Sequence, residues 1–145
     1  MSLNKQKEEL FSSFSYFMIA SVVFAIGILF YYYFRQPTIV AQYLGIDTLN
    51  IDATYKNYIN WFPSFAHVFS FSIFTWLILE KHYANGAILF WTLFNLFVEF
   101  GQMLTQPMNF LPQFLNNYFI RGTFSVSDAI AIIIAALCAK ILIRR

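Results

Sequence analysis

Residues 11–34 form an apolar run of 24 residues that contains no charged side chain. About 20 such residues are enough for a helix to cross the hydrocarbon core of a bilayer. Lys5 and Lys7 precede the run, as basic residues precede the apolar region of a signal peptide. The run is longer than the apolar region of a signal peptide, however, and it lacks a clear small-x-small cleavage motif. It therefore predicts a membrane anchor that is retained at the N-terminus.

Three further apolar runs follow, and none of them carries more than two charged residues. The whole chain is 59% hydrophobic and only 11% charged, whereas a soluble domain carries about 25% charged residues. A chain this short cannot bury so much apolar surface in a water-soluble core, so lipid must solvate much of it. We predict an all-α fold and a single membrane domain, residues 1–145, with four transmembrane helices at about 11–34, 61–80, 85–104 and 125–143 and outer loops at about 35–60 and 105–124.

The basic residues indicate which side of the membrane each loop faces. Four spans place both termini on one side, and that side carries six Lys and Arg residues against three on the other. Cytoplasmic segments are enriched in basic residues, so we expect the short termini, with Ser2 and Arg145, to be cytoplasmic. The six residues are Lys5, Lys7, Lys81, Lys140, Arg144 and Arg145, and the three are Arg35, Lys56 and Arg121.

The remaining composition argues against several kinds of protein. The net charge is only +2, and the basic residues occur singly or in pairs, which gives nucleic-acid binding no support. Cys138 is the only cysteine, so neither a disulfide within the chain nor a multi-cysteine metal site can form. No nucleotide-binding loop appears, and no cofactor is expected.

Three ionisable residues fall inside the predicted spans at nearly the same depth. At about 1.5 Å of rise per residue, His67 and Glu99 lie about 21 Å from the inner ends of their helices, and Asp128 lies about 24 Å from its own. An ionisable group inside a membrane is costly unless it is paired or hydrated, and is therefore a functional candidate. We predict that the three side chains converge within about 10 Å in the outer half of the membrane. Glu99→Gln should then impair function more than stability, and Glu99→Leu could even stabilise the bundle.

Neighbouring polar residues extend this cluster along the helix faces. Four polar residues of the third span recur at intervals of 3, 4 and 3, which is one stripe of an α-helix: Thr92, Asn95, Glu99 and Gln102. Polar stripes turn away from lipid, so we predict a polar pocket that opens outward, is closed inward by aromatic packing and is roofed by residues 105–124. The candidate binding residues are Ser64, His67, Asn95, Glu99, Gln102, Arg121 and Asp128.

Each candidate also has a purely structural interpretation. His67 could form a hydrogen bond between helices, and Glu99 could pair within the bundle. Asp128 lies near the start of its predicted helix, where the helix dipole favours a carboxylate. Arg121 could be an interfacial anchor. The many Phe, Tyr and Trp side chains are interpreted as lipid-facing or interfacial residues and not as a cofactor site.

Three short motifs resemble the VanZ-like family of small bacterial membrane proteins, over roughly residues 60–143. They are Pro63-Ser64-Phe65-Ala66-His67 opening one helix, Glu99-Phe100-Gly101-Gln102 near the outer end of the next, and Arg121-Gly122-Thr123-Phe124-Ser125-Val126-Ser127-Asp128 opening the last. The family usually follows the aspartate with an asparagine and glycines, where this chain has Ala131, Ile132, Ala135 and Ala136. The resemblance implies a four-helix envelope protein, linked in some members to low-level resistance to glycopeptide antibiotics such as teicoplanin.

Four functions fit these features. The first is a binding module for a lipid headgroup, a lipid-linked cell-wall precursor or an amphiphilic antibiotic, in which Arg121 faces a phosphate or carboxylate. The second is an outer-leaflet enzyme that uses His67 with Glu99 or Asp128 as acid and base, or that holds one metal ion with all three. The third is a proton-coupled transporter, which would need a homodimer. The fourth is a structural subunit of a larger membrane complex. We favour the binding module, with membrane lipids as its partners.

Overall fold

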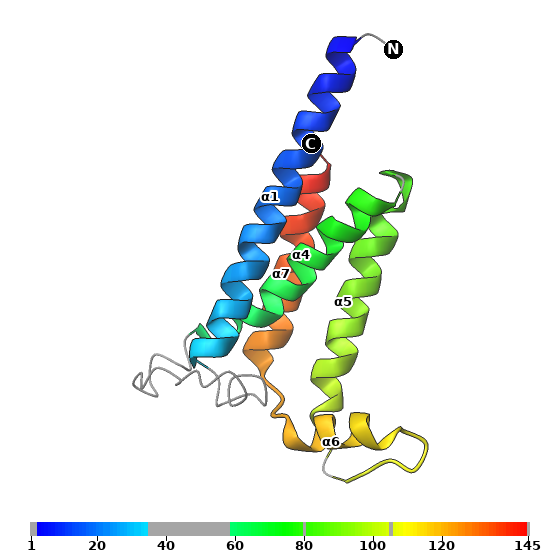
Figure 1. The fold of residues 1–145 in the computed structure, drawn as a ribbon. Helices are drawn as coiled ribbons and strands as arrows, with labels where there is room; N and C mark the ends of the chain where they lie inside the picture. The colour runs from blue at the N-terminus through cyan, green and yellow to red at the C-terminus, as the bar shows by residue number, and fades with distance from the viewer. Residues whose placement is uncertain (1–2, 35–58, 80, 105, 145) are drawn as a thin grey trace.

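The computed structural model describes residues 3–34, 59–79, 81–104 and 106–144, without the side chains of residues 3–10, 31–34, 81 and 121. The described residues form helices and connecting turns and contain no strand (Figure 1), which confirms the predicted all-α fold for this part of the chain. The elements are α1 (Leu3–Phe34), α4 (Phe62–Ile78), the short 3-10 helix η1 (Lys81–Tyr83), α5 (Ala84–Gly101), α6 (Gln113–Arg121) and α7 (Val126–Ile143).

Three of the described helices are long and apolar enough to cross a membrane: Phe11–Phe30 within α1, then α5 and α7. The second predicted span, residues 61–80, forms the apolar helix α4, which has 17 residues and is shorter than the other three candidates. Pro63 stands in the first turn of α4, where its missing N–H costs no hydrogen bond. Leu79 has an extended backbone and ends the helix. The length and apolar composition of these three helices indicate a membrane protein.

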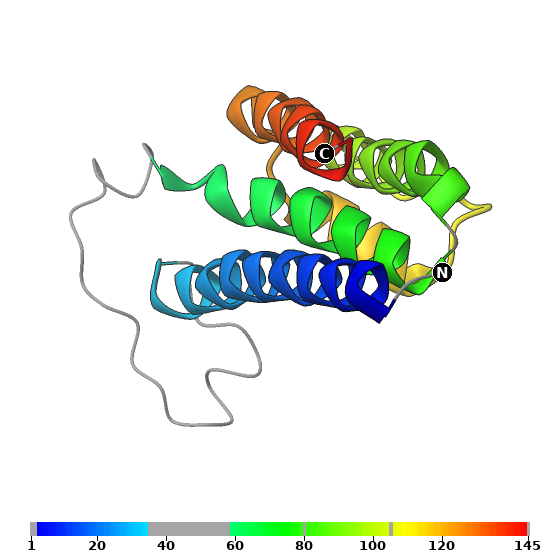
Figure 2. The same cartoon turned by 90° about the horizontal axis from the view of Figure 1, so that it is seen from above.

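Helix α4 lies at the centre of the bundle and packs against α1, α5 and α7, as the view along the helices shows (Figure 2). Its side chains Val68, Phe69 and Ile73 belong to the hydrophobic core, which α7 completes with Ile132 and Ala135. By contrast, α1 packs chiefly against one side of α4 and leaves most of its apolar surface uncovered. The shortest of the four apolar helices is thus the one most enclosed by protein.

Small residues let α7 come close to its neighbours. Ala131, Ala135 and Ala139 recur every four residues and are buried, so they form one ridge of the helix. Small side chains at such positions allow backbones to approach closely in membrane bundles. Ala131 and Ala135 stand in the region where the sequence departs from the VanZ-like pattern, and both are buried. A hydrogen bond of 2.9 Å from Ser70 Oγ to the Ala20 carbonyl joins α4 to α1 in a similarly close contact.

The two ends of the bundle differ. Both termini lie at the end that carries η1, and the first turns of α1 extend beyond the other helices there (Figure 1). Helix α6 lies across the opposite end. The predicted outer loop 105–124 contains this helix, which the sequence interpretation did not anticipate as a helix. Most of the other predicted loop, residues 35–60, lies outside the described residues.

Candidate functional site

A cavity of about 460 Å³ lies between α4, α5 and α6. Helices α4 and α5 separate from each other as they approach α6, which closes the space between them (Figure 1). Six of the ten residues that line the cavity are aromatic, and His67 and Asn95 are the predicted site residues among them. The lining residues are His67, Phe71, Trp91, Phe94, Asn95, Val98, Phe114, Leu115, Tyr118 and Phe119. The cavity thus differs from the polar pocket expected from the sequence, because rings supply most of its wall.

The ring of His67 is half-buried and lies among other rings. It stacks on Phe71 with a centroid separation of 5.9 Å, and Phe24 of α1 approaches it at 6.2 Å. Phe71 in turn stacks on Trp91 of α5 at 4.8 Å. Trp91 Nε1 donates a hydrogen bond of 2.8 Å to Thr75 Oγ1 of α4, which fixes the indole between the two helices. One wall of the cavity is therefore a series of rings with an imidazole at one end.

The polar stripe of α5 is partly satisfied by the helix itself. Thr92 Oγ1 donates to the Ile88 carbonyl at 2.7 Å, and Asn95 Nδ2 donates to the Trp91 carbonyl at 2.8 Å. Bonds of this kind to the carbonyl four residues earlier satisfy a polar side chain within an apolar helix. This bond uses one of the two N–H groups of the Asn95 amide, so Asn95 can offer its amide oxygen and its second N–H to a ligand in the cavity.

Glu99 lies outside the cavity lining and is bound to the start of α7. The residue is only 5% exposed, and its Oε1 accepts a hydrogen bond of 2.6 Å from the backbone N–H of Ser125. Ser125 is the N-cap residue of α7, and Asp128, 2% exposed, stands in the first turn of that helix. A carboxylate close to a helix N-terminus is stabilised by the exposed N–H groups there. The two predicted carboxylates therefore meet the same helix end from two different helices.

Two glycines allow α6 and the following turn to press against the last turn of α5. A Cβ placed on Gly101 would lie 2.5 Å from the ring of Phe119 of α6. A Cβ on Gly122 would lie 2.6 Å from the Gln102 side chain. The absence of a side chain at these positions permits both close contacts, and Gly122 lies directly against Gln102. The predicted residue Gln102 thus belongs to the junction between α5 and α7 and not to the cavity wall.

The loop before α6 is held by Asn116, a buried residue of α6. Its Oδ1 accepts a hydrogen bond of 2.9 Å from the Met108 N–H, and its Nδ2 donates to the carbonyls of Met108 and Leu111. Pro112 precedes α6 as its N-cap residue. This network gives α6 a defined position, with Phe114, Leu115, Tyr118 and Phe119 lining the cavity.

The other predicted site residues lie elsewhere. Ser64 is half-buried in the first turn of α4 and does not line the cavity. Arg121 is the last residue of α6, but its side chain lies outside the described part of the structure. Within the described residues, no three His, Cys, Asp or Glu side chains are grouped so as to hold a metal ion. The alternative in which His67, Glu99 and Asp128 share one metal therefore has no matching arrangement.

Sequence reasoning missed the aromatic residues as parts of the site. Phe71, Trp91 and Phe119 line the cavity, although aromatic side chains were assigned to the lipid-facing surface as a class. The four α6 residues of the lining, at positions 114, 115, 118 and 119, recur on one face of a helix. This spacing is the signal that could have identified an amphipathic helix in the predicted outer loop.

Comparison with known proteins adds no relative: no protein-family model, no curated protein and no solved structure matches the chain.

Proposed function

We propose that this chain is a binding protein of the bacterial cytoplasmic membrane, similar to VanZ-like proteins, that holds an amphiphile in the cavity between α4, α5 and α6. The observation that carries the proposal is the cavity itself. Its volume of about 460 Å³ falls within the range of about 300–1,000 Å³ typical of small-molecule sites. Such sites are mostly apolar with a few placed polar groups, and here those groups are His67 and Asn95.

The proposal includes four membrane-spanning helices with both termini in the cytoplasm. Helix α4 has 17 residues and so is about 26 Å long, close to the roughly 30 Å of the hydrocarbon core. Its central position between three apolar helices supports a span of similar depth. Both termini lie at one end of the bundle (Figure 1), as an even number of spans requires. The excess of basic residues near the termini then places that end in the cytoplasm.

The wall of the cavity favours a ligand with both an apolar and a polar part. Rings from α4, α5 and α6 offer an apolar surface to a hydrocarbon chain. The His67 imidazole and the Asn95 side-chain amide can each donate a hydrogen bond to a phosphate, and the Asn95 amide oxygen can accept one from a hydroxyl or an amide N–H. Lipid headgroups, lipid-linked cell-wall precursors and amphiphilic antibiotics such as teicoplanin all combine these two features. We assign this class of ligand to the cavity.

Two residues of the VanZ-like motifs, Glu99 and Gln102, lie outside the cavity lining and contact the segments that flank α6. Glu99 binds the N-terminus of α7, and Gln102 packs under Gly122, just after α6. Both contacts determine where α6 lies relative to α5. In this proposal Glu99 and Asp128, at the start of α7, position the wall of the site, while His67 and Asn95 contact the ligand.

Trp91 provides a direct probe of the cavity. In the double variant Trp61→Phe/Trp76→Phe it is the only remaining tryptophan, and it lines the cavity. We expect a phospholipid or prenyl-phosphate analogue with a brominated chain to quench the Trp91 fluorescence of this variant saturably. Circular dichroism before the titration checks that the variant retains its helices.

A matched pair of substitutions makes the test specific. Val98→Phe fills the cavity, whereas Val22→Phe adds the same volume on the exposed surface of α1. Val98→Phe should abolish saturable quenching, and Val22→Phe should leave it unchanged. Equal quenching in both variants would show that the probe only dissolves in the surrounding detergent or lipid, and the proposal would be wrong. With binding established, teicoplanin susceptibility of cells that express each variant distinguishes an antibiotic from a native lipid as the ligand.

A further inference from the structure

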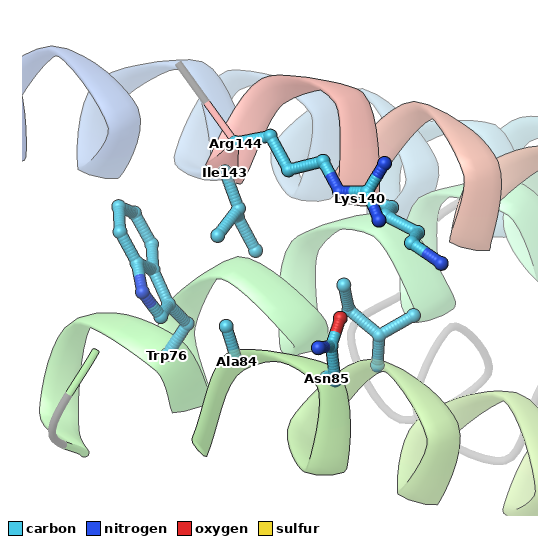
Figure 3. Close-up of a pocket in the computed structure, with 7 residues that line it drawn as sticks. Trp76, Ala84, Asn85, Lys140, Ile143 and Arg144 are labelled. Atoms are coloured by element: carbon cyan, nitrogen blue, oxygen red, sulfur yellow. The ribbon is translucent and has the colours of Figure 1, made fainter. Parts of the chain in front are cut away.

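A second cavity, of about 220 Å³, lies at the opposite end of the bundle from α6. The end of α4, the start of α5 and the end of α7 enclose it. The lining residues are Trp76, Ala84, Asn85, Ile88, Lys140, Ile143 and Arg144. Figure 3 shows the two cationic side chains leaving α7 on the side that faces Asn85 and the first turn of α5. This cavity shares no lining residue with the amphiphile cavity.

The charged side chains among the described residues that line this second cavity are both basic. Lys140 and Arg144 stand four residues apart on α7, where like charges repel each other. The carboxylates whose side chains the structure describes are Glu99 and Asp128, and both lie near the other end of the bundle. No acidic residue is among the described residues that line the cavity. Two cations therefore line a small, half-open space in this part of the structure.

The first turn of α5 adds to this positive character. It carries no acidic residue, and its N-cap residue Tyr83 makes no side-chain capping bond. The first N–H groups of an α-helix lack partners within the helix and carry a partial positive charge. Ala84 and Asn85 of this turn line the cavity, and Ile88 lies one turn further along the same wall. Asn85 also brings an amide, which can donate a hydrogen bond to an anion.

We infer that this second cavity holds the phosphate group of an anionic phospholipid. Basic pockets between transmembrane helices bind anionic headgroups on the cytoplasmic side of membranes. Arg and Lys bind phosphate oxygens through charge-assisted hydrogen bonds. Trp76, Ile88 and Ile143 supply an apolar wall next to the cations, which suits the glycerol and first chain carbons of a lipid. A soluble phosphate would use the two cations but would gain nothing from that wall.

Native mass spectrometry of the purified full-length chain in detergent tests this site. The chain is titrated with phosphatidylglycerol and with phosphatidylcholine of the same acyl composition. We expect the first phosphatidylglycerol to bind more tightly than phosphatidylcholine. Lys140→Gln/Arg144→Gln should weaken its binding by about 30-fold, since each cation contributes about a five-fold gain. Ala84→Leu keeps every charge and fills the cavity, so it should also weaken phosphatidylglycerol binding.

The matched control removes two basic residues outside the cavity. Lys5→Gln/Lys7→Gln makes the same change of net charge in α1, which does not line the cavity. Its affinity for phosphatidylglycerol should stay within about two-fold of the parent. An equal loss in this control, or unchanged binding by Ala84→Leu, would assign the effect to general surface charge and overturn the site. Displacement of the lipid by an excess of inorganic phosphate would overturn the lipid assignment in favour of a soluble phosphate.

Discussion

Glu99 of α5 and Ser125 of α7 are joined by a hydrogen bond of 2.6 Å from the Ser125 backbone N–H to Glu99 Oε1. In a capping box, the side chain at the third helical position makes this bond to the N-cap N–H. That position in α7 holds Asp128, yet the acceptor comes from another helix. Glu99 of α5 thus caps the N-terminus of α7 in place of Asp128. The same bond joins the end of α5 to the start of α7, and α6 lies between these two points in the sequence.

This bond predicts losses of stability of different size for two substitutions at position 99. Glu99→Gln keeps an oxygen that can accept from Ser125 and should cost about 1 kcal/mol, because only the charge assistance is lost. Glu99→Leu leaves the Ser125 N–H without this acceptor and should cost about 2–3 kcal/mol. Thermal unfolding in detergent, followed by circular dichroism, measures both. A Leu variant more stable than the parent would contradict the capping role.

Ser125 should tolerate substitution better than an ordinary N-cap serine. Its hydroxyl makes no capping bond and instead lies 2.7 Å from the Ser127 hydroxyl. Replacing a capping serine by alanine typically costs about 1 kcal/mol. We expect Ser125→Ala to cost less than about 0.5 kcal/mol, because the backbone N–H bound to Glu99 remains. The same unfolding assay checks this, and a loss as large as that of Glu99→Leu would show that the hydroxyl is the capping group.

The apolar helices were predictable because lipid selects long runs without charge. The run at residues 85–104 and the observed α5, Ala84–Gly101, differ by only a few residues. The partners of the polar residues were not predictable, because helix spacing shows which face a side chain occupies and not which atom it meets. Thr92 and Asn95 bond to their own helix, and Glu99 meets a backbone N–H. The sequence interpretation therefore allowed Glu99→Leu to stabilise the bundle, whereas the hydrogen bond to Ser125 predicts a loss of stability.

The cavity was hidden in the sequence for a different reason. Aromatic residues make up 21% of the chain, so the rings that face lipid and those that line a site look alike in composition. Phe90 is exposed on α5, whereas the neighbouring Trp91 lines the cavity. Only the separation of α4 from α5 and the position of α6 distinguish the two residues. Such tertiary relationships are not encoded in a local pattern.

Two glycines of α5 should respond oppositely to the same change. Gly101→Ala places a methyl group 2.5 Å from the ring of Phe119, which is 1% exposed and would have to shift. Overpacking of this kind costs about 1–3 kcal/mol. Gly86→Ala meets nothing within 4 Å, and alanine stabilises a helix by about 0.5–1 kcal/mol relative to glycine. The melting temperatures of the two variants should therefore move in opposite directions, and parallel shifts would contradict the contact between α5 and α6.

The alanine ridge of α7 gives a comparable test in the core. Ala135 is fully buried in the hydrophobic core, so Ala135→Leu should force α7 away from its neighbours at a cost of about 1–3 kcal/mol. Ala25 is exposed on α1, where Ala25→Leu adds the same atoms to an uncovered surface. A thiol-reactive fluorophore reports the unfolding of each variant through Cys138, the only cysteine. Equal stability of the two variants would show that α7 is not closely packed.

The role of His67 can be separated from its packing by substitution with phenylalanine. His67→Phe keeps a ring that can stack on Phe71 and removes both ring nitrogens. If the imidazole binds the polar part of the ligand, its loss removes one hydrogen bond, which weakens binding by about 3- to 10-fold. Saturable quenching of Trp91, in the background without Trp61 and Trp76, measures this affinity directly. Val98→Phe, which blocks the cavity, supplies the value for no binding. An affinity equal to that of the parent would leave His67 as a packing residue and assign the polar contact to Asn95.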